Sequence, residues 1–197
     1  KPSDGSGDFD FSRNSAATRV NAQGLVENVQ ILSSNLVQNG DFSEEGVQEV
    51  SNGSFTNGST DWILGSGWSI GEDKAVADGT TNNAISQTTI SSVVGKSYKI
   101  DFTIDDYVTG NIRIYFGGVF TPFVNVNGVY SFYITATAVD ALATSASGLF
   151  NGSITNISVK EVGQNWVLFS GWSIGNNKVI GDGTAFSNIE QTPILIQ

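Results

Sequence analysis

The stretch SYKIDFTID, residues 97–105, decides the fold class of this chain of 197 residues. Apolar and polar side chains alternate along it, with Tyr98, Ile100, Phe102 and Ile104 on one face. Successive side chains of a β-strand point to opposite faces of the sheet, so this alternation predicts a half-buried strand.

The same alternation recurs twice after this stretch. NIRIYF (111–116) and VYSFYIT (129–135) alternate in the same way, and further strands are expected in WSI, AVA, NAISQTTI and ITNISVKEV. VDALATSASG (139–148) is the one helix candidate, and we interpret it as a strand because its neighbours already form sheet. Turns are predicted between the strands at Gly71, Gly79, Gly95, Gly110, Gly117–Gly118, Asn127–Gly128 and Asn151–Gly152. Short strands with such spacing predict an all-β sandwich or jelly roll.

The composition agrees with a folded β protein and excludes several functions. The chain has 12 Phe, 5 Tyr and 4 Trp, and only 14% of its residues are charged. Its net charge of −10 opposes nucleic-acid binding, which depends on Lys and Arg. Cys and His are absent, which excludes disulfides, His or Cys metal ligands and His-assisted nucleophiles. No run of 18 apolar residues occurs, so no membrane insertion is expected.

A repeat sets the expected domain boundaries. WILGSGWSIGEDKAVADGT (62–80) returns as WVLFSGWSIGNNKVIGDGT (166–184), and 16 of 32 aligned positions are identical at a shift of 104. We expect an extended anchoring segment over 1–49, a jelly-roll module over 50–163 and the start of a second copy over 164–197. The second copy lacks counterparts of the residues after Val93, so we expect the natural chain to continue or a neighbouring chain to lend strands. NGDFS at Asn39 and NGSFT at Asn52 are interpreted as a duplicated entry turn.

The N-terminal segment DFDFSRNSAATRVNAQGLVENV, matched from Phe9 to Val29, resembles a segment of tail, fibre and appendage proteins of tailed bacteriophages. LVQNGDFS, WSIG, GKSYKIDFTI, YSFYITAT and GSITNISVKEV resemble the jelly-roll module of the same proteins, which is similar in architecture to family 4/9 carbohydrate-binding modules. The resemblance implies a structural protein of the virion with tandem β-sandwich modules. It also implies a homotrimeric fibre, other virion proteins as partners and a place on the particle surface.

The resemblance also implies a structural calcium, which relatives hold between the Asn-Gly-x-Phe entry and an Asp near the final strand. Here Asn156 stands where that Asp is common, and Ser54 replaces the acidic residue that Asp41 provides in the first entry. Calcium prefers several oxygen ligands that include carboxylates. We therefore expect no cofactor, with Asp41 as the one weak calcium candidate.

Six aromatic residues are candidates for contact with a host-surface glycan: Trp62, Trp68, Trp166, Trp172, Phe120 and Phe123. An apolar sugar face can rest on an aromatic ring. A Trp repeated at a strand start is more often a core residue, so packing is the preferred role for the four tryptophans. Phe120 and Phe123 lie in a Gly/Pro loop and could equally cap the sandwich or form an interface.

The remaining candidates concern docking and catalysis. Phe9, Phe11, Arg13 and Arg19 are candidates for docking on a partner protein, because their segment cannot form its own core. Asp105 and Asp106 are adjacent at a strand end and are tested as a glycosidase pair, but we interpret them as a solvated turn before YVTGN. They would point to opposite faces if the strand continued. DGT at Asp78 and Asp182 is a turn signature, so we expect no enzyme.

The sequence therefore predicts a non-catalytic phage virion protein whose sandwich modules serve attachment or glycan contact. Two alternatives stay open: a carbohydrate-binding region of a secreted bacterial enzyme, and a bacterial surface adhesin.

Overall fold

Every element of the protein is a β-strand in the part of the chain that the computed structural model describes, residues 18–28, 37–184 and 188–191. The chain divides into two compact units, Lys1–Leu36 and Val37–Gln197. No helix among the described residues is long and apolar enough to cross a membrane. The predicted all-β class is confirmed.

The first unit contains one antiparallel hairpin of β1 (Thr18–Val20) and β2 (Val26–Asn28). The Asn21 side chain shapes its turn, because its Oδ1 accepts hydrogen bonds from the backbone N–H groups of Gln23 and Leu25, both at 3.0 Å. The segment predicted as extended thus contains a hairpin. Arg19 lies opposite Glu27 in this ladder, whereas the docking candidates Phe9, Phe11 and Arg13 lie outside the described residues.

The second unit begins with the strands of the first module, by which we mean residues 50–163, and the strand that precedes it. These strands are β3 (Glu45–Gln48), β4 (Ile63–Leu64), β5 (Trp68–Gly71), β6 (Lys74–Asp78), β7 (Ile85–Gln87), β8 (Ser97–Phe116), β9 (Val119–Phe120), β10 (Gly128–Thr135) and β11 (Leu142–Val162). The C-terminal repeat, residues 164–191, adds β12 (Trp166–Leu168), β13 (Trp172–Gly175), β14 (Lys178–Gly181) and β15 (Ile189–Gln191).

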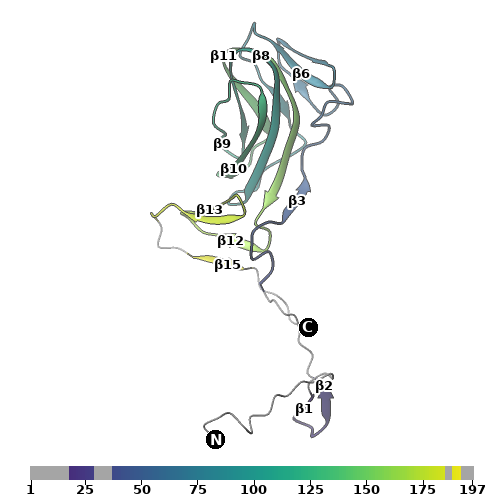
Figure 1. The fold of residues 1–197 in the computed structure, drawn as a ribbon, viewed down its shortest axis with the longest axis vertical. Coiled ribbons are helices and arrows are strands. Elements are labelled where there is room, and N and C mark those ends of the chain that lie inside the picture. Colours follow the sequence, from purple (N-terminus) through teal and green to yellow (C-terminus); the bar gives the residue numbers. More distant parts are fainter. Residues whose placement is uncertain (1–17, 29–36, 185–187, 192–197) are drawn as a thin grey trace, which may run out of the picture. The chain divides into compact units, whose positions relative to one another are not determined.

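Two long antiparallel strands, β8 and β11, organise the first module and run side by side in Figure 1. Each of them bends back on itself. The bend is clear in β8, because the rings of Tyr98 and Phe116 lie 18 positions apart in one strand yet have centroids 5.1 Å apart. The two halves of each strand therefore belong to two layers of one sandwich.

The first layer pairs the N-terminal half of β8 with β10 and with the C-terminal half of β11, which also pairs with β6 and β3. The second layer pairs the C-terminal half of β8 with β9 and with the N-terminal half of β11, followed by β7 and β4. Both layers contribute to one core. Its largest fully buried side chains include Phe55, Ile100, Phe102, Ile104, Ile112, Ile114, Phe116, Phe150 and Ile154.

The strands predicted from alternation are present, but two of the predicted turns are wrong. Gly110 and Asn151–Gly152 lie inside β8 and β11, where hydrogen bonding continues through the bends with register shifts. Gly110 has a φ of +79° and lies so close to Phe150 that a Cβ would come within 2.5 Å of the Phe150 Cα. Glycine here serves a close backbone approach within the sheet and does not end the strand.

Glu45 fixes β3 to the edge of the first layer. Its two carboxylate oxygens accept separate hydrogen bonds from Lys99 Nζ at 2.7 Å and Lys160 Nζ at 2.8 Å. These contacts, with Lys160 first, hold the pKa of Glu45 below its ordinary value of 4.5. Ionised Glu45 therefore stabilises the attachment of β3.

Acid is expected to weaken that attachment. A carboxyl group whose pKa is lowered by folding contributes stability above its unfolded-state pKa and loses it as the pH falls through the folded-state pKa. Below pH 4.5 the unfolding free energy of the wild type should therefore fall more steeply than that of Glu45→Gln, measured by urea unfolding. Glu44→Gln is the matched control and should keep the wild-type slope; equal slopes for all three proteins would contradict the role given to Glu45.

Candidate functional site

The outward face of the second layer carries the group of side chains best suited to a ligand. Along β8, Ile112, Ile114 and Phe116 point into the core, so Arg113 and Tyr115 point outward. Directly opposite residues of antiparallel strands share a face, which places Tyr115 in a row across five strands. The row consists of Phe120, Tyr115, Ala143, Ser86 and Ile63. We call this surface, together with Arg113, Phe123 and Ser145, the aromatic face.

Arg113 is held between two phenylalanine rings on the aromatic face. Its guanidinium carbon lies 3.7 Å from the Phe120 ring centroid and 4.2 Å from that of Phe123. These distances allow attraction between the cation and both ring faces. Phe120 is 45% exposed and Phe123 is 44% exposed, so the stack remains open to solvent. Arg113 Nε also donates a long hydrogen bond of 3.5 Å to Ser145 Oγ.

Tyr115 extends this cluster toward a carboxylate. Its ring centroid lies 4.7 Å from that of Phe120, and its hydroxyl donates a 2.7 Å hydrogen bond to Asp140 Oδ2. The hydrogen bond to Asp140 raises the pKa of Tyr115, so the phenol stays protonated at neutral pH. The aromatic face thus combines apolar rings with a fixed cation and a carboxylate.

Trp62 and Trp68 lie in the core of the first module. Trp62 is 6% exposed, packs on Phe55 at 5.1 Å and donates from Nε1 to the Asn52 carbonyl at 3.1 Å. Trp68 is 9% exposed, stacks on Phe150 and donates from Nε1 to the Asn83 carbonyl at 2.8 Å. Neither ring offers a free face to a sugar, because both are covered by other aromatic residues.

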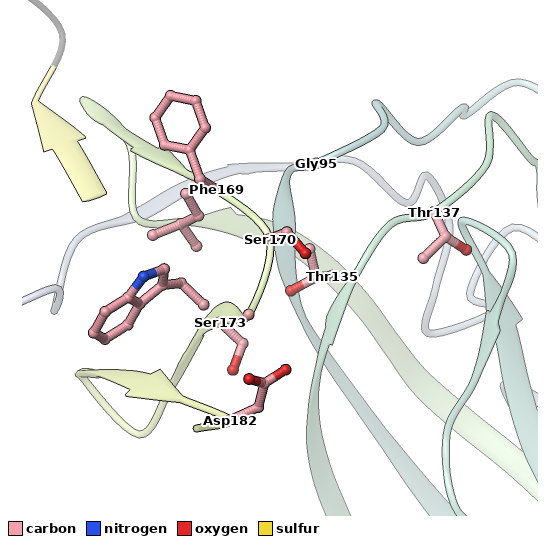
Figure 2. A pocket seen from close by; sticks show the side chains of 10 residues that line it. Gly95, Thr135, Thr137, Phe169, Ser170, Ser173 and Asp182 are labelled. Atoms are coloured by element: carbon pink, nitrogen blue, oxygen red, sulfur yellow. The ribbon is translucent and has the colours of Figure 1, made fainter. Parts of the chain in front are cut away.

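Trp166 and Trp172 belong to the C-terminal repeat and are only half-buried. Trp166 packs on Phe42 at 5.1 Å and donates from Nε1 to the Gln38 and Asn39 carbonyls. Trp172 lines a cleft of about 330 Å³, in which Ser173 and Asp182 come from the repeat while Gly95 and Thr135 come from the first module (Figure 2). The structure therefore separates the six aromatic candidates: it brings together Phe120 and Phe123 and no other pair at one surface.

The carboxylates considered for catalysis have structural partners. Lys74 Nζ lies 3.5 Å from Asp105 and 3.1 Å from Asp106, whose carboxylate also accepts a hydrogen bond from Ser153 Oγ. The turn predicted at these acids is wrong, because β8 continues through them. Asp106 has a φ of +53° that interrupts the alternation, and Lys74 contacts both acids. The hydrogen bond from Ser153 and then that from Lys74 lower the pKa of Asp106, which keeps it ionised.

The DGT turns have the same internal structure in both copies. Asp78 Oδ1 accepts hydrogen bonds from the backbone N–H and the hydroxyl of Thr80, at 2.8 and 2.6 Å. Asp182 accepts the same two bonds from Thr184 at the same distances. Both carboxylates are thus turn residues, as their sequence context predicted.

The position that the resemblance gives to calcium is a shallow hollow lined by Asn52, Ser54, Asn57 and Asn156 without any carboxylate. The Asn52 side chain is already used, because its Oδ1 accepts from the Asn57 N–H and its Nδ2 donates to the carbonyls of Gly58 and Thr60. Asp41 instead accepts from Ser43, whose side-chain hydrogen bond lowers the pKa of Asp41. These residues do not fit calcium, and within the described ranges no cluster of three or more acidic residues could hold a metal ion.

Comparison with known proteins gives similarity to solved structures alone. No family model matches the chain, and no curated protein matches it. Among solved structures the chain is similar to one titled "BiXyn10A CBM1 APO", with 18% sequence identity over 61% of this chain and 91% of that chain and a TM-score of 0.33. A similarity at this TM-score transfers no functional residue, and the phage resemblance of the N-terminal segment stays a prediction.

Proposed function

We propose that the chain is a non-catalytic, carbohydrate-binding protein and that a glycan docks on its aromatic face. The observation that carries this proposal is the stack of Arg113 between the half-exposed rings of Phe120 and Phe123. Ligand sites combine apolar and aromatic surface with a few fixed polar groups, and this stack supplies both. The rings offer apolar surface to the C–H face of a sugar, and the guanidinium offers hydrogen-bond donors to its hydroxyls.

The rest of the aromatic face fits an extended, uncharged ligand. Ala143, Ser86 and Ser145 are small residues that place little bulk above the sheet beside Tyr115. The Asp140 carboxylate can accept hydrogen bonds from sugar hydroxyls through its free lone pairs. Because the chain has a net charge of −10, a neutral glycan is favoured over an anionic one.

Binding to a panel of neutral oligosaccharides, measured by glycan microarray and then by calorimetry, tests this proposal. The double variant Phe120→Ala/Phe123→Ala is expected to weaken binding at least about tenfold, or about 1.4 kcal/mol. Val129→Ala is the matched control, because Val129 is 80% exposed on β10 in the first layer and should bind like the wild type. Wild-type protein that binds no neutral glycan, or a folded double variant with unchanged affinity, would refute the proposal.

A virion role is a second candidate, favoured by the specific phage-like motif of the first unit. That motif forms the β1–β2 hairpin, a small element with exposed Val20, Leu25 and Val26 that could dock on other virion proteins or on sister chains. We propose on this basis a trimeric fibre on the particle surface with the sandwich modules pointing toward the host. Light scattering after gel filtration should then give three times the monomer mass of 20.8 kDa, and a monomer at all concentrations would remove the fibre proposal while leaving glycan binding untouched.

A further inference from the structure

The C-terminal repeat packs on residues that precede the first module in the sequence. In the first module, the entry segment Ser51–Asn57 starts the fold that continues through β4 to β7. In the C-terminal repeat, the segment Gln38–Glu44 occupies the same position relative to β12 to β15. Matching hydrogen bonds, ring contacts and ladder registers support this equivalence.

The entry turns themselves are alike. Phe55 N–H donates to the Asn52 carbonyl and Phe42 N–H to the Asn39 carbonyl, both at 3.1 Å. The side chain of Asn52 accepts from the backbone N–H five residues later, and the side chain of Asn39 does the same, again both at 3.1 Å. Asn39, Phe42, Asn52 and Phe55 all have positive φ values between 45° and 58°. The two segments therefore share one conformation.

Each entry turn also holds the equivalent tryptophan. Phe55 and Trp62 have ring centroids 5.1 Å apart at 42°, and Phe42 and Trp166 have centroids 5.1 Å apart at 43°. Trp62 Nε1 donates to the Asn52 carbonyl at 3.1 Å, and Trp166 Nε1 donates to the Asn39 carbonyl at 3.1 Å. The entry turn of residues 39–43 thus receives Trp166, although more than 120 residues separate them.

The last strand of each set contacts its entry segment in the same way. Gln87 Nε2 donates to the Ser51 carbonyl at 2.8 Å, and Gln191 Nε2 donates to the Gln38 carbonyl at 2.8 Å. The ladders also agree in register, since Trp68 lies opposite Ala77 in β5–β6 and Trp172 lies opposite Gly181 in β13–β14. The C-terminal repeat is thus the same fold as β4 to β7, assembled with a distant entry segment.

The chain enters and leaves the first module at one place. Residues 45–48 lead in as β3, and the end of β11 leads out beside it, with Gln48 opposite Lys160 and Glu45 opposite Val162. Adjacent ends are what a domain inserted into another domain requires. In the first module a short loop joins Asn57 to Thr60. Between the equivalent residues of the C-terminal repeat and its entry segment, the first module takes the place of that loop.

Within the described ranges, two strands of the C-terminal repeat have one edge without a ladder partner. In the first module β6 pairs with β5 on one side and with β11 on the other, and β7 pairs with β4 and with β11. Among the described residues, β14 pairs with β13 alone and β15 with β12 alone. The missing neighbour in both cases is the counterpart of β11.

Side-chain burial points to the same missing strand. Ala75, Ala77 and Ile85 are 0%, 4% and 0% exposed under the cover of β8 and β11. Their counterparts Val179 and Ile189 are half-buried and Gly181 is exposed. Positions that form a core in one copy thus form an uncovered face in the other.

We propose that residues 37–44 and 164–191 are two parts of one second module, into which the first module and its lead-in strand β3 are inserted, and that the edges of β14 and β15 bind a strand pair of the β8 and β11 type. The occupant is a polypeptide segment with the alternating pattern of Ser97–Phe116 and Leu142–Val162, antiparallel to β14. The first module shows what such a pair does there: it pairs with both edges and buries the face below them.

Appending a second copy of residues 94–163 directly after Gln197 supplies this occupant in register, because Gln197 aligns with Val93. Hydrogen exchange read by mass spectrometry should show at least about tenfold slower exchange for residues 178–182 and 189–191 in the extended chain than in the original chain, because paired amides are protected. In the extended chain Phe42→Ala should speed exchange in β12 to β15 and leave β4 to β7 unchanged. Phe55→Ala is the matched control with the opposite pattern.

Unchanged exchange at β14 and β15 in the extended chain would overturn the strand-pair proposal. A dimer of the original chain with these edges already protected would also overturn it, because a second copy would then occupy them. The insertion would be refuted if Phe42→Ala affected β4 to β7 as strongly as β12 to β15. All these outcomes are independent of glycan binding.

Discussion

Trp68→Ala is expected to lower the unfolding free energy of the first module by about 3–5 kcal/mol, the range measured when a buried Trp or Phe is truncated. Trp68 is 9% exposed, and its ring stacks on Phe150 with centroids 6.2 Å apart. Truncation would leave a cavity between β5 and β11 and would also remove the hydrogen bond to the Asn83 carbonyl. Urea unfolding followed by far-UV circular dichroism measures the change.

The equivalent residue of the C-terminal repeat gives the matched control. Trp172 has the same neighbours in sequence but is half-buried. Trp172→Ala is therefore expected to lower the unfolding free energy by about 1 kcal/mol or less, as for a partly exposed site. Trp68→Phe keeps an aromatic ring against Phe150, so its loss of unfolding free energy should lie between those of Trp68→Ala and Trp172→Ala. Equal losses for Trp68→Ala and Trp172→Ala would contradict the burial described for Trp68.

Local pattern was enough to predict most of the strands. The alternation in residues 97–105, 111–116 and 129–135 reports directly which side chains are buried, and the structure has strands at all three places. The same pattern contained the signal for Arg113 and Tyr115, because they are the outward positions between Ile112, Ile114 and Phe116. They were not among the predicted site residues, because it is the pairing of β9 with the end of β8 that brings Phe120 next to Tyr115.

Contacts between distant segments could not be predicted from the sequence. NGDFS at Asn39 and NGSFT at Asn52 do share one turn conformation, as predicted. The sequence around Asn39 gives no hint, however, that this turn packs on Trp166. Likewise Trp68 and Trp172 lie in identical WSIG stretches and differ in burial because of strands elsewhere in the chain. Periodicity records which face is covered, but it does not record which segment covers it.

Gly53→Ala is expected to lower the unfolding free energy by about 3 kcal/mol, at the upper end of the range for overpacking. A Cβ on Gly53 would overlap the carbonyl oxygen of Ile157, which is backbone and cannot rotate away. The Ile157 N–H also donates to the Gly53 carbonyl at 2.9 Å, so the two segments cannot separate without losing a hydrogen bond. The substitution should therefore force the entry turn away from β11.

Gly40 is the equivalent glycine of the other entry turn and provides the control. Among the described residues, a Cβ there would meet only the Val37 side chain, at 3.1 Å. Gly40→Ala should therefore change the unfolding free energy by less than about 1 kcal/mol, as expected where a flexible side chain can give way. Both variants can be compared by urea unfolding in one buffer. A Gly53→Ala protein as stable as the Gly40→Ala protein would contradict this prediction, because it would show that the entry turn at Asn52 is not held against β11. The turn at Asn52 could then no longer serve as the standard for the turn at Asn39.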